Sequence, residues 1–456
     1  MTFDKDLTGR KISVIGAGVS GSALAGLAKE LGADVFVSDA KELSADTEAF
    51  FKKEDIAYEA GGNTERLLDA DEIIISSGIS PDVPILGEAV SRGIKLVGEL
   101  DFVYPYLSGT VIAITGSNGK TTTASMTGYF LEQCGLKTIT AGNIGNPVAK
   151  AAGDDYDFIV LELSSFQLYW TEKFKCDVAI VTNLAPDHID WHGSYKKYVE
   201  AKAKIIRCLN DNGTAIFQKR DASDLNIPEG MGFPLIWGKT VKEVPGIYMD
   251  ESMKGAFLNG GNSSTTCKLF DFSSVKLLGT HNMENAAMSL AVPALFNLGE
   301  IPPSVISSYI PPKHRCAYAG EKGGITFVDD SKGTNVAASI TAMSSLSGTK
   351  VIILGGKGKG EDYAPLAEAA LRYTKYAVIL GSEKEKIAAA LDKAGYSDYT
   401  VVSTMEEAVT TAFEKAESGD TVLLSPACTS WDMYPNYGAR GDHFCMIAKG
   451  IIEKEK

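Results

Sequence analysis

Short apolar runs alternate with amphipathic stretches along most of this chain of 456 residues, and such alternation is typical of an α/β protein. Four apolar runs in the first hundred residues predict buried strands: 11–17, 34–39, 71–78 and 94–99. The stretch between the first two runs has helical spacing and ends at Gly32. Because strands that alternate with helices form parallel sheets, we expect the first part of the chain to be Rossmann-like.

The same alternation begins again twice. A second set of strands is predicted at 110–116, 157–165 and 176–184, and helices are predicted at 121–133 and 282–298. The segment 213–275 is rich in Gly, Asn, Ser and Thr and predicts β-rich decoration. A proline-rich stretch at 301–315 indicates a domain boundary. Further strands are predicted at 325–331, 350–360, 376–382, 399–403 and 420–428. We therefore predict three α/β domains in series, at 1–108, 109–311 and 312–456, of which the last is also expected to be Rossmann-like.

Composition excludes some classes of partner. The 44 basic and 58 acidic residues give a net charge of −14, which argues against a general nucleic-acid or anionic-membrane binder. The seven cysteines are scattered and form no Cys-x-x-Cys pair, as expected for reduced cytoplasmic thiols. No apolar stretch approaches the roughly 20 residues of a membrane span, and no signal peptide is evident. We expect a monomeric, cytoplasmic protein.

A glycine loop in the first domain has the Gly-x-Gly-x-x-Gly pattern at Gly16, Gly18 and Gly21. Asp39 closes the next predicted strand about twenty residues later, where a dinucleotide site keeps its ribose acid. One interpretation is a nicotinamide dehydrogenase. That interpretation explains only the first forty residues of the chain.

A second loop, ITGSNGKTTT at 114–123, resembles the end of a Walker A motif at Gly119, Lys120 and Thr121. Ile114 stands where the motif has its first glycine. A strand that leads through glycines into a helix N-terminus still favours phosphate binding. We expect Lys120 to neutralise terminal phosphates and the Thr121 hydroxyl to bind Mg²⁺. The alternative is a glycine-rich turn with a solvated lysine. The second domain is therefore predicted to be a P-loop-type ATPase domain.

Two further segments carry candidate metal ligands. Glu162 follows four apolar residues at the end of a predicted strand, where a buried carboxylate requires a cation or a salt bridge. His188 and His192 are spaced i, i+4 in DHIDWH, but no helix is predicted there and no third ligand is near. Zinc is therefore disfavoured, and His188 is a better candidate ligand for a second Mg²⁺.

Seven motifs together resemble the Mur ligase family over essentially the whole chain: TGSNGKTTT, LELSSFQL, NLAPDHIDWHG, LLGTHNMENAAMS, PPKHR, VDDSKGTN and LSPACTSWDMY. Within that family, LELSSFQL and SPACTSWD are most similar to the members that add D-glutamate to UDP-N-acetylmuramoyl-L-alanine. The Asp-Asn-Pro-Arg motif typical of members that add meso-diaminopimelate or lysine is absent. Folylpolyglutamate synthases share the ligase core but usually lack an N-terminal UDP-binding domain.

The resemblance changes the meaning of the first glycine loop, because the Rossmann-like domain of the family binds the UDP end of the substrate. The same glycines suit any diphosphate at a helix N-terminus. The resemblance implies UDP-substrate contacts at Val19, Ser20, Asp39, Ser76, Gly78, Asn143 and His188. Ala40 stands where some relatives have a hydroxyl residue, so one polar contact is lost or moved.

The resemblance also implies a reaction of cytoplasmic peptidoglycan synthesis. ATP phosphorylates the alanyl carboxylate, the amine of D-glutamate attacks the acyl phosphate, and a tetrahedral intermediate expels phosphate. Two Mg²⁺ ions screen the repulsion between anions. Residues matching ATP contacts are Gly116, Ser117, Asn118, Gly119, Lys120, Thr121, Thr122, Asn282, Asn285, Arg315, Asp330 and Lys332. Residues matching the D-glutamate pocket are Thr334, Lys359, Ser430, Trp431 and Tyr437.

The family motifs further imply metal ligands at Thr121, Glu162, His188 and Lys202, the last as a carbamylated lysine. Lys120, His188, Lys202 and Lys332 are the implied catalytic residues. Lys204 is the rival of Lys202, and Lys357 is the rival of Lys359. From the residues alone, Lys202 would be taken as a solvated helix lysine, and the glycine-rich loop that holds Lys357 and Lys359 could equally lie on the surface. A nucleotide-dependent switch protein is a further alternative, although VDDSKGTN and SPACTSWD indicate a second-substrate site.

Overall fold

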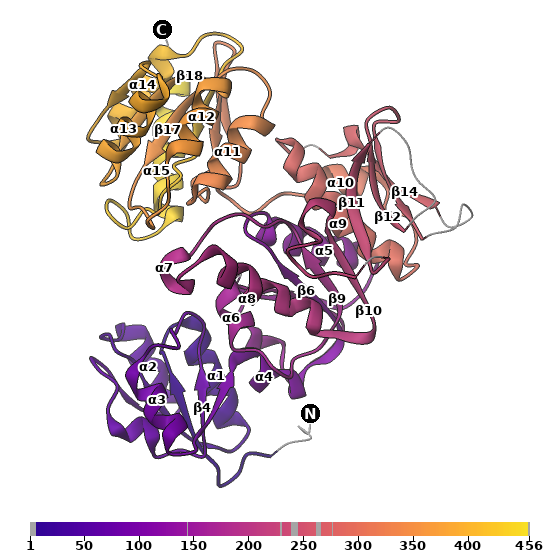
Figure 1. Ribbon diagram of the computed structural model, residues 1–456, viewed down its shortest axis with the longest axis vertical. Helices are drawn as coiled ribbons and strands as arrows, with labels where there is room; N and C mark the ends of the chain where they lie inside the picture. Colours follow the sequence, from indigo (N-terminus) through magenta and orange to yellow (C-terminus); the bar gives the residue numbers. More distant parts are fainter. Residues whose placement is uncertain are drawn as a thin grey trace.

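The computed structural model describes residues 6–143, 145–228, 230–238, 245–260, 266–275 and 277–454. Figure 1 shows three lobes, with the N-terminal and C-terminal lobes at opposite ends of the long axis and the central lobe between them. Each lobe contains one sheet flanked by helices. The predicted fold class, three α/β domains in series, is therefore confirmed.

The N-terminal sheet is entirely parallel, with strand order β3-β2-β1-β4-β5. Its strands are β1 Lys11–Ile15, β2 Asp34–Ser38, β3 Ala57–Glu59, β4 Glu72–Ile75 and β5 Lys95–Gly98. Its helices are α1 Val19–Glu30, α2 Ala45–Lys53, α3 Pro84–Ser91 and α4 Glu99–Val103, with 3₁₀ turns η1 Glu65–Leu68 and η2 Tyr104–Tyr106. The order reverses next to β1, so the loops after β1 and β4 meet at one edge, where open α/β sheets bind ligands.

The central sheet has nine strands in the order β14-β13-β12-β11-β10-β9-β6-β8-β7, of which only the β12–β13 and β13–β14 pairs are antiparallel. The strands are β6 Ser108–Thr115, β7 Thr138–Gly142, β8 Asp155–Glu162, β9 Cys176–Val181, β10 Leu209–Gln218, β11 Phe233–Gly238, β12 Gly246–Asp250, β13 Gly255–Asn259 and β14 Thr266–Asp271. The last five confirm the predicted β-rich segment.

The helices of the central domain are α5 Lys120–Gln133, α6 Ser165–Tyr169, α7 Ile189–His192, α8 Tyr195–Arg207, α9 Thr280–Leu295 and α10 Pro303–Ser308. The described residues of this domain also include the 3₁₀ turns η3 Val148–Ala151, η4 Lys219–Asp221 and η6 Phe272–Ser274. The expectation of no helix around His188 and His192 was wrong, because α7 forms one turn there. That turn is too short to show helical periodicity, and it ends at Gly193 with a φ of +75°.

The C-terminal sheet has the order β15-β16-β20-β17-β18-β19, with only β15 antiparallel to its neighbour. Its strands are β15 Ala317–Lys322, β16 Ile325–Asp329, β17 Lys350–Gly355, β18 Thr374–Leu380, β19 Tyr399–Val401 and β20 Thr421–Leu424. Its helices are α11 Val336–Ser345, α12 Ala364–Tyr373, α13 Lys384–Ala394, α14 Met405–Lys415 and α15 Tyr437–Glu453. No helix among the described residues is long and apolar enough to cross a membrane.

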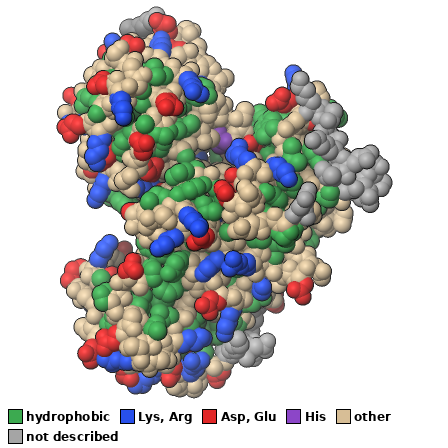
Figure 2. Space-filling model, viewed as in Figure 1, with side chains coloured by type: hydrophobic (Ala, Val, Ile, Leu, Met, Phe, Trp, Pro, Cys, Tyr) green, Lys and Arg blue, Asp and Glu red, His purple; other side chains and the backbone are tan. Residues whose placement is uncertain are grey.

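The apolar core clusters do not correspond to the three sheets, because one cluster spans two domains and the C-terminal sheet has two clusters. A single cluster joins the N-terminal and central domains, and it includes Leu24, Leu100, Val148 and Leu168. The C-terminal sheet instead packs its two faces into two clusters of its own. On the face drawn in Figure 2, basic and acidic side chains are interspersed over all three lobes.

Candidate active site

Three neighbouring parallel strands of the central sheet, β9, β6 and β8, end at the same edge. The loop after β6 is the glycine loop, β8 ends at Glu162, and β9 leads to Asp187 and His188. The register places Ile114 opposite Glu162, so the acidic residue lies beside the start of the loop. Chain topology thus brings these separate motifs to one site.

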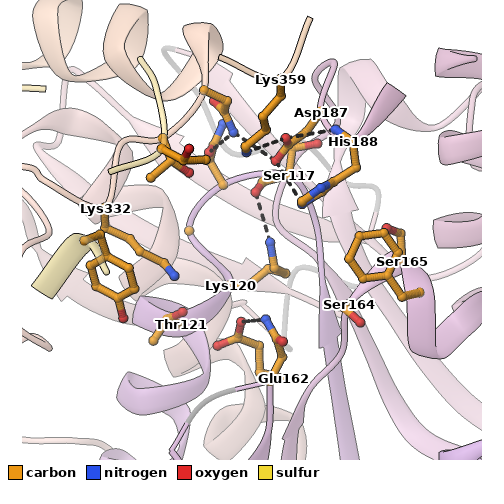
Figure 3. Close-up of a pocket in the computed structure, with 18 of the residues that line it drawn as sticks. Ser117, Lys120, Thr121, Glu162, Ser164, Ser165, Asp187, His188, Lys332 and Lys359 are labelled. Carbon is orange, nitrogen blue, oxygen red and sulfur yellow. Dashed lines mark hydrogen bonds and ion pairs between the residues drawn. The ribbon is translucent and has the colours of Figure 1, made fainter. Parts of the chain in front are cut away.

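A cavity of about 450 Å³ lies over this edge, where the C-terminal domain faces the central domain. Figure 3 shows the side chains converging on it, and Figure 2 shows the hollow between the upper and middle lobes. The predicted residues that line it are Ser117, Asn118, Gly119, Lys120, Thr121, Asn143, Glu162, His188, Lys202, Arg315, Lys332, Thr334, Lys359, Ser430, Trp431 and Tyr437. Lys204 and Lys357 are not among its lining residues.

The glycine loop is packed too tightly for side chains. Gly116 has a φ of +144°, and a Cβ there would lie 2.0 Å from the Thr182 hydroxyl oxygen. Gly119 has a φ of +81° and directly precedes α5. The Lys120 ammonium folds back over the loop and donates to the carbonyls of Gly116, at 2.9 Å, and Ser117, at 3.0 Å. Burial lowers the pKa of Lys120, so a bound anion would favour its charged form.

Glu162 is a buried carboxylate with one unsatisfied oxygen. Its Oε1 accepts a hydrogen bond from the Asn143 side-chain amide at 3.3 Å. Its Oε2 has no hydrogen-bond partner among the described residues. Because a buried, unpaired carboxylate oxygen is costly, this atom is suited to a cation.

Lys202 is 1% exposed and also faces the glycine loop, where its ammonium donates to the Gly116 carbonyl at 2.7 Å. Burial, followed by repulsion from Lys120, lowers the pKa of Lys202 well below its ordinary value. Its rival Lys204 points away and donates to the Tyr169 carbonyl.

Asp187 connects the central domain to the C-terminal domain. Its Oδ1 accepts from the Lys359 ammonium at 2.9 Å, and its Oδ2 accepts from the Asn335 amide at 3.1 Å. Although burial acts in the opposite direction, Lys359, His188 and Lys120 together lower the pKa of Asp187 to about 2. Asp187 is therefore a permanent anion at this domain contact.

His188 lies beside this anion with its Nε2 3.6 Å from Asp187 Oδ2. Burial lowers the pKa of His188 to about 4, so the imidazole is neutral and can serve as a metal ligand. His192 instead shares a hydrogen bond with the Ser165 hydroxyl at 2.9 Å. Within the described part of the chain, no group of three or more His, Cys, Asp or Glu residues could hold a metal ion.

A second, smaller cavity of about 60 Å³ continues from the glycine loop toward α9 and α11. Four more predicted residues line it: Thr122, Asn282, Asn285 and Asp330. Asp330 accepts from the Ser425 hydroxyl at 2.7 Å, and burial raises its pKa to about 7. Arg315 and Lys332 line both cavities, and the Arg315 guanidinium donates to the Thr121 hydroxyl.

The C-terminal wall of the main cavity holds Lys332 over the ring of Tyr437, with the ammonium 4.0 Å from the ring centroid. Burial, followed by repulsion from Arg315, lowers the pKa of Lys332 to about 7. The Ser430 hydroxyl is buried and has no partner among the described residues, whereas the neighbouring Trp431 is 68% exposed.

Six predicted residues line neither cavity. One is Gly116 of the glycine loop, and the other five belong to the N-terminal domain: Val19, Ser20, Asp39, Ser76 and Gly78. Asp39 holds the glycine loop of that domain, because its Oδ2 accepts from the Ala17 backbone at 2.7 Å. A Cβ at Gly21 would lie 1.8 Å from the Gly16 carbonyl oxygen, so helix α1 can pack on the loop only without a side chain there. The loop after β4 contacts the central domain, since the Trp191 indole donates to the Gly78 carbonyl at 3.2 Å.

Sequence reasoning missed several lining residues: Ser164, Ser165, Phe166, Asp187, Tyr198, His281, Asn335, Thr429 and Asn436. Asp187 stands directly before His188, and Asn335 ends VDDSKGTN, so both belong to motifs already noted. Their position next to predicted site residues is the sequence signal that could have identified them as lining residues. The contact between Asp187 and Asn335 joins positions 148 residues apart, and the sequence gives no sign of it.

Three family models match consecutive parts of the chain. They are the MurD N-terminal domain at residues 11–85, the Mur ligase middle domain at 114–293, and the glutamate ligase domain of Mur ligases at 314–428. Solved structures share the fold at low identity. The UDP-N-acetylmuramate–alanine ligase MurC of Thermotoga maritima aligns over 97% of this chain and 100% of its own, with a TM-score of 0.58 and 18% identity. The MurF ligase of Thermotoga maritima, solved in complex with ADP, aligns over 98% of this chain and 99% of its own, with the same TM-score and identity.

Relatives match at higher identity along nearly the full length. The UDP-N-acetylmuramoylalanine–D-glutamate ligase of Natranaerobius thermophilus is 35% identical over 458 residues, which cover 97% of this chain and 98% of that protein. The protein of the same name from Koribacter versatilis is 36% identical over 461 residues, which cover 99% and 100%. The chain therefore belongs to the Mur ligase family, and within it to the UDP-N-acetylmuramoylalanine–D-glutamate ligases.

Proposed function

We propose that this protein ligates D-glutamate to UDP-N-acetylmuramoyl-L-alanine, with conversion of ATP to ADP and phosphate, in cytoplasmic peptidoglycan precursor synthesis. The observation that carries the proposal is the single cavity that combines a phosphate-type glycine loop, an unpaired buried carboxylate and cations from two domains. The full-length relatives support the choice of both substrates. The domains at 1–108, 109–311 and 312–456 then bind the UDP substrate, ATP and D-glutamate, respectively.

The reaction brings several anions together, and the cavity supplies compensating charge. Lys120, Lys332 and Arg315 approach the space over the glycine loop from two domains, where they can hold the phosphates of ATP during transfer to the alanyl carboxylate. Gly119, Thr121 and Thr122 stand at the start of α5, where backbone N–H groups favour an anion. The N–H groups of Ser117 and Asn118 donate to Asn183 and hold the loop in place. Asn282, Asn285 and Asp330 line the smaller cavity, which suits the adenosine end.

Mg²⁺ fits the donor set on one wall of the cavity. The free Oε2 of Glu162 and the hydroxyl of Thr121 are hard oxygen donors, and the neutral imidazole of His188 could hold a second ion. When bound, Mg²⁺ would neutralise phosphate charge during transfer. The residues of this chain would hold the ions and fix the direction from which the carboxylate approaches.

Lys202 is the residue we propose to be carbamylated. A lysine reacts with carbon dioxide as the neutral amine, and the buried position of Lys202 disfavours its charged form. The modified side chain would place a carboxylate beside the glycine loop, facing Glu162. An NMR measurement with ¹³C-labelled carbon dioxide should show one carbamate signal that is absent in Lys202→Arg.

D-glutamate would bind on the C-terminal wall, where Lys359 supplies a cation and the unpartnered Ser430 hydroxyl supplies a donor. Thr334, Trp431 and Tyr437 complete that wall. Because these groups belong to a different domain from the glycine loop, domain closure would assemble the site and exclude water from the acyl phosphate. Val19, Ser20, Asp39, Ser76 and Gly78 would bind the UDP end, and Asn143 and His188 the muramoyl end.

The first test measures phosphate release from ATP with UDP-N-acetylmuramoyl-L-alanine present. D-glutamate, L-glutamate, meso-diaminopimelate or L-lysine is added in parallel reactions, with and without Mg²⁺. Release that requires D-glutamate, the UDP substrate and Mg²⁺ together is expected. Release with another amino acid, or oxidation of NADH on a keto substrate, would contradict the proposal.

Two variants test which domain binds ATP and which binds the UDP substrate. Lys120→Ala should abolish ligation while it leaves binding of the UDP substrate intact, because the lysine serves the ATP phosphates. Asp39→Ala should mainly raise the KM for the UDP substrate, and a loss confined to ATP binding would contradict the assignment. Lys52→Ala is the matched control, since Lys52 is an exposed helix residue paired with Glu48 in the N-terminal domain.

A further inference from the structure

A carboxyl group, Glu99, is buried where the N-terminal and central domains meet. It is the first residue of α4 and is 1% exposed. Gly98 directly before it packs so closely on the central domain that a Cβ would lie 2.5 Å from the Trp170 carbonyl oxygen. Glu99 is therefore fixed in the junction itself and does not reach out to solvent.

The carboxyl group bridges the two domains through one oxygen. Its Oε2 accepts from the Ser77 hydroxyl of the N-terminal domain at 2.7 Å and from the Gln167 amide of the central domain at 3.1 Å. Its Oε1 has no hydrogen-bond partner in the part of the chain that the structure describes. Burial raises the pKa of Glu99, while the hydroxyls of Ser77 and Ser20 and the Gln167 amide act in the opposite direction.

Both partners of Glu99 belong to segments that line the proposed substrate path. Ser77 stands between Ser76 and Gly78, which we propose contact the UDP end. Gln167 caps α6, because its Oε1 accepts from the Ser164 backbone at 2.9 Å and from the Ser164 hydroxyl at 3.0 Å. Ser164 lines the main cavity. A continuous chain of hydrogen bonds thus leads from the UDP loop to the cavity wall.

Two tryptophans of the central domain hold the same N-terminal loop. The Trp170 indole donates to the Ile79 carbonyl at 3.1 Å, and the Trp191 indole donates to the Gly78 carbonyl at 3.2 Å. These contacts are independent of Glu99, and they show that the loop after β4 is attached to the central domain at several points.

We propose that Glu99 is a positioning residue, which through Ser77 and Gln167 sets the separation between the UDP-binding loop and the cavity where the alanyl carboxylate reacts. This inference rests on the proposed function, because only a substrate that spans both domains senses that separation. A misplacement of about 1 Å between bound reactants can cost about 10²-fold in rate. Glu99 itself touches no reacting atom in this scheme.

The test is a double-mutant cycle of Glu99→Ala, Gln167→Ala and the double variant, with Glu99→Gln as the conservative replacement. Each single alanine variant should lower kcat/KM for the UDP substrate about 30-fold while the dissociation constant for ATP stays unchanged. The double variant should be no worse than the poorer single variant, because both changes break the same link. Glu99→Gln, which keeps the accepting oxygen, should stay within about threefold of the unmodified protein.

Glu72→Ala is the matched control. Glu72 is also a buried carboxyl group of the N-terminal sheet, and it pairs with Arg10 and Lys95. It begins β4, whereas Ser77 follows the other end of that strand. Its removal should lower the melting temperature without raising the KM for the UDP substrate. If Glu99→Ala fails to fold, kcat/KM for the UDP substrate is compared between Gln167→Ala, which breaks the link, and Glu99→Gln, which keeps it.

Additive losses in the cycle, or unchanged kcat/KM in Gln167→Ala, would overturn the positioning role. The same holds if Glu72→Ala impairs the UDP substrate as strongly as Glu99→Ala does. The failure of the proposed function would be different in kind, since the unmodified protein would then show no phosphate release that depends on D-glutamate and the UDP substrate.

Discussion

The two domain junctions of this protein differ in the chemical type of the side chains that form them. Between the N-terminal and central domains, apolar side chains of α1 and α4 pack against η3 and α6 in one continuous cluster. Between the central and C-terminal domains, most contacts are polar: Asp187 with Lys359 and Asn335, Arg315 with Thr121, and His281 with Ser345. Leu278 of the central domain also packs against the C-terminal cluster.

From this difference we infer which domain can move. An apolar junction loses its stabilisation when it opens, because its surface is returned to water. A junction of ion pairs and hydrogen bonds can exchange protein partners for water or for ligand groups at little net cost. The C-terminal domain is therefore the one expected to open and close, while the first two domains, which share one apolar cluster, are expected to move as one body. The predictions below test this contrast, in order of decreasing expected effect.

Leu100→Ala tests the apolar junction. Leu100 is fully buried in the shared cluster, so its truncation should lower the free energy of unfolding by about 3 kcal/mol, within the usual range of about 2–5 kcal/mol. Chemical denaturation followed by tryptophan fluorescence would measure the change. The KM for D-glutamate should stay the same. A cost below about 1 kcal/mol would show that this junction is not a packed core.

Lys359→Met tests the polar junction. The change removes the ion pair with Asp187 and the cation proposed for D-glutamate, while it keeps most of the side-chain volume. We expect kcat/KM for D-glutamate to fall about 30-fold, equivalent to about 2 kcal/mol. The matched control is Lys357→Met, because Lys357 is tied to Thr429 through its backbone and does not line the cavity. A larger loss in Lys357→Met than in Lys359→Met would reverse the choice between the two lysines, and equal losses would contradict a specific role for Lys359.

The polar junction should also respond to pH through Lys332. Its pKa of about 7 means that the amine is largely neutral above pH 7 in the free protein. Since ATP phosphates favour the charged form, ATP binding should take up a proton, and affinity should fall by up to tenfold per pH unit above pH 7. Calorimetry in two buffers of different ionisation enthalpy would measure the uptake. Lys332→Arg should remove the contribution of Lys332 and leave that of Asp330, whose pKa is also about 7, because arginine remains charged.

A rise in salt concentration should weaken the polar junction more than the apolar one, and this effect is the smallest that we expect. Raising the ionic strength from 0.1 M to 1 M shortens the screening length from about 10 Å to about 3 Å. We expect the ion pair between Asp187 and Lys359 to weaken by less than about 1 kcal/mol and the radius of gyration to rise, as measured by small-angle scattering. Lys359→Met should show no such salt response. A compact, salt-independent particle in both cases would mean that the C-terminal domain does not open.

Some features of the site could be predicted from local patterns. Lys120 follows a strand and a glycine turn, and this context predicts a phosphate loop without knowledge of the rest of the chain. Glu162 ends an apolar run, which predicts a buried carboxylate. The one-turn helix at Ile189–His192 could not be predicted in this way, because four residues are too few for periodicity. The sequence predicts a ligand contact at Asp39, whereas the structure shows that its carboxylate accepts a hydrogen bond within the glycine loop, from the Ala17 backbone.

What the sequence determined by itself is the set of elements and the local chemistry of each motif, because strand runs, glycine turns and helix starts depend on neighbours in the chain. Tertiary structure decided which motifs meet. Strand order placed the loops of β6, β8 and β9 at one edge, and domain packing brought Lys359 to Asp187, 172 residues away. It also buried Glu99 between two domains, although Glu99 is only the last residue of the run 94–99 that predicts a strand. Contacts of this kind depend on the packing of whole surfaces, and no short window of sequence contains that information.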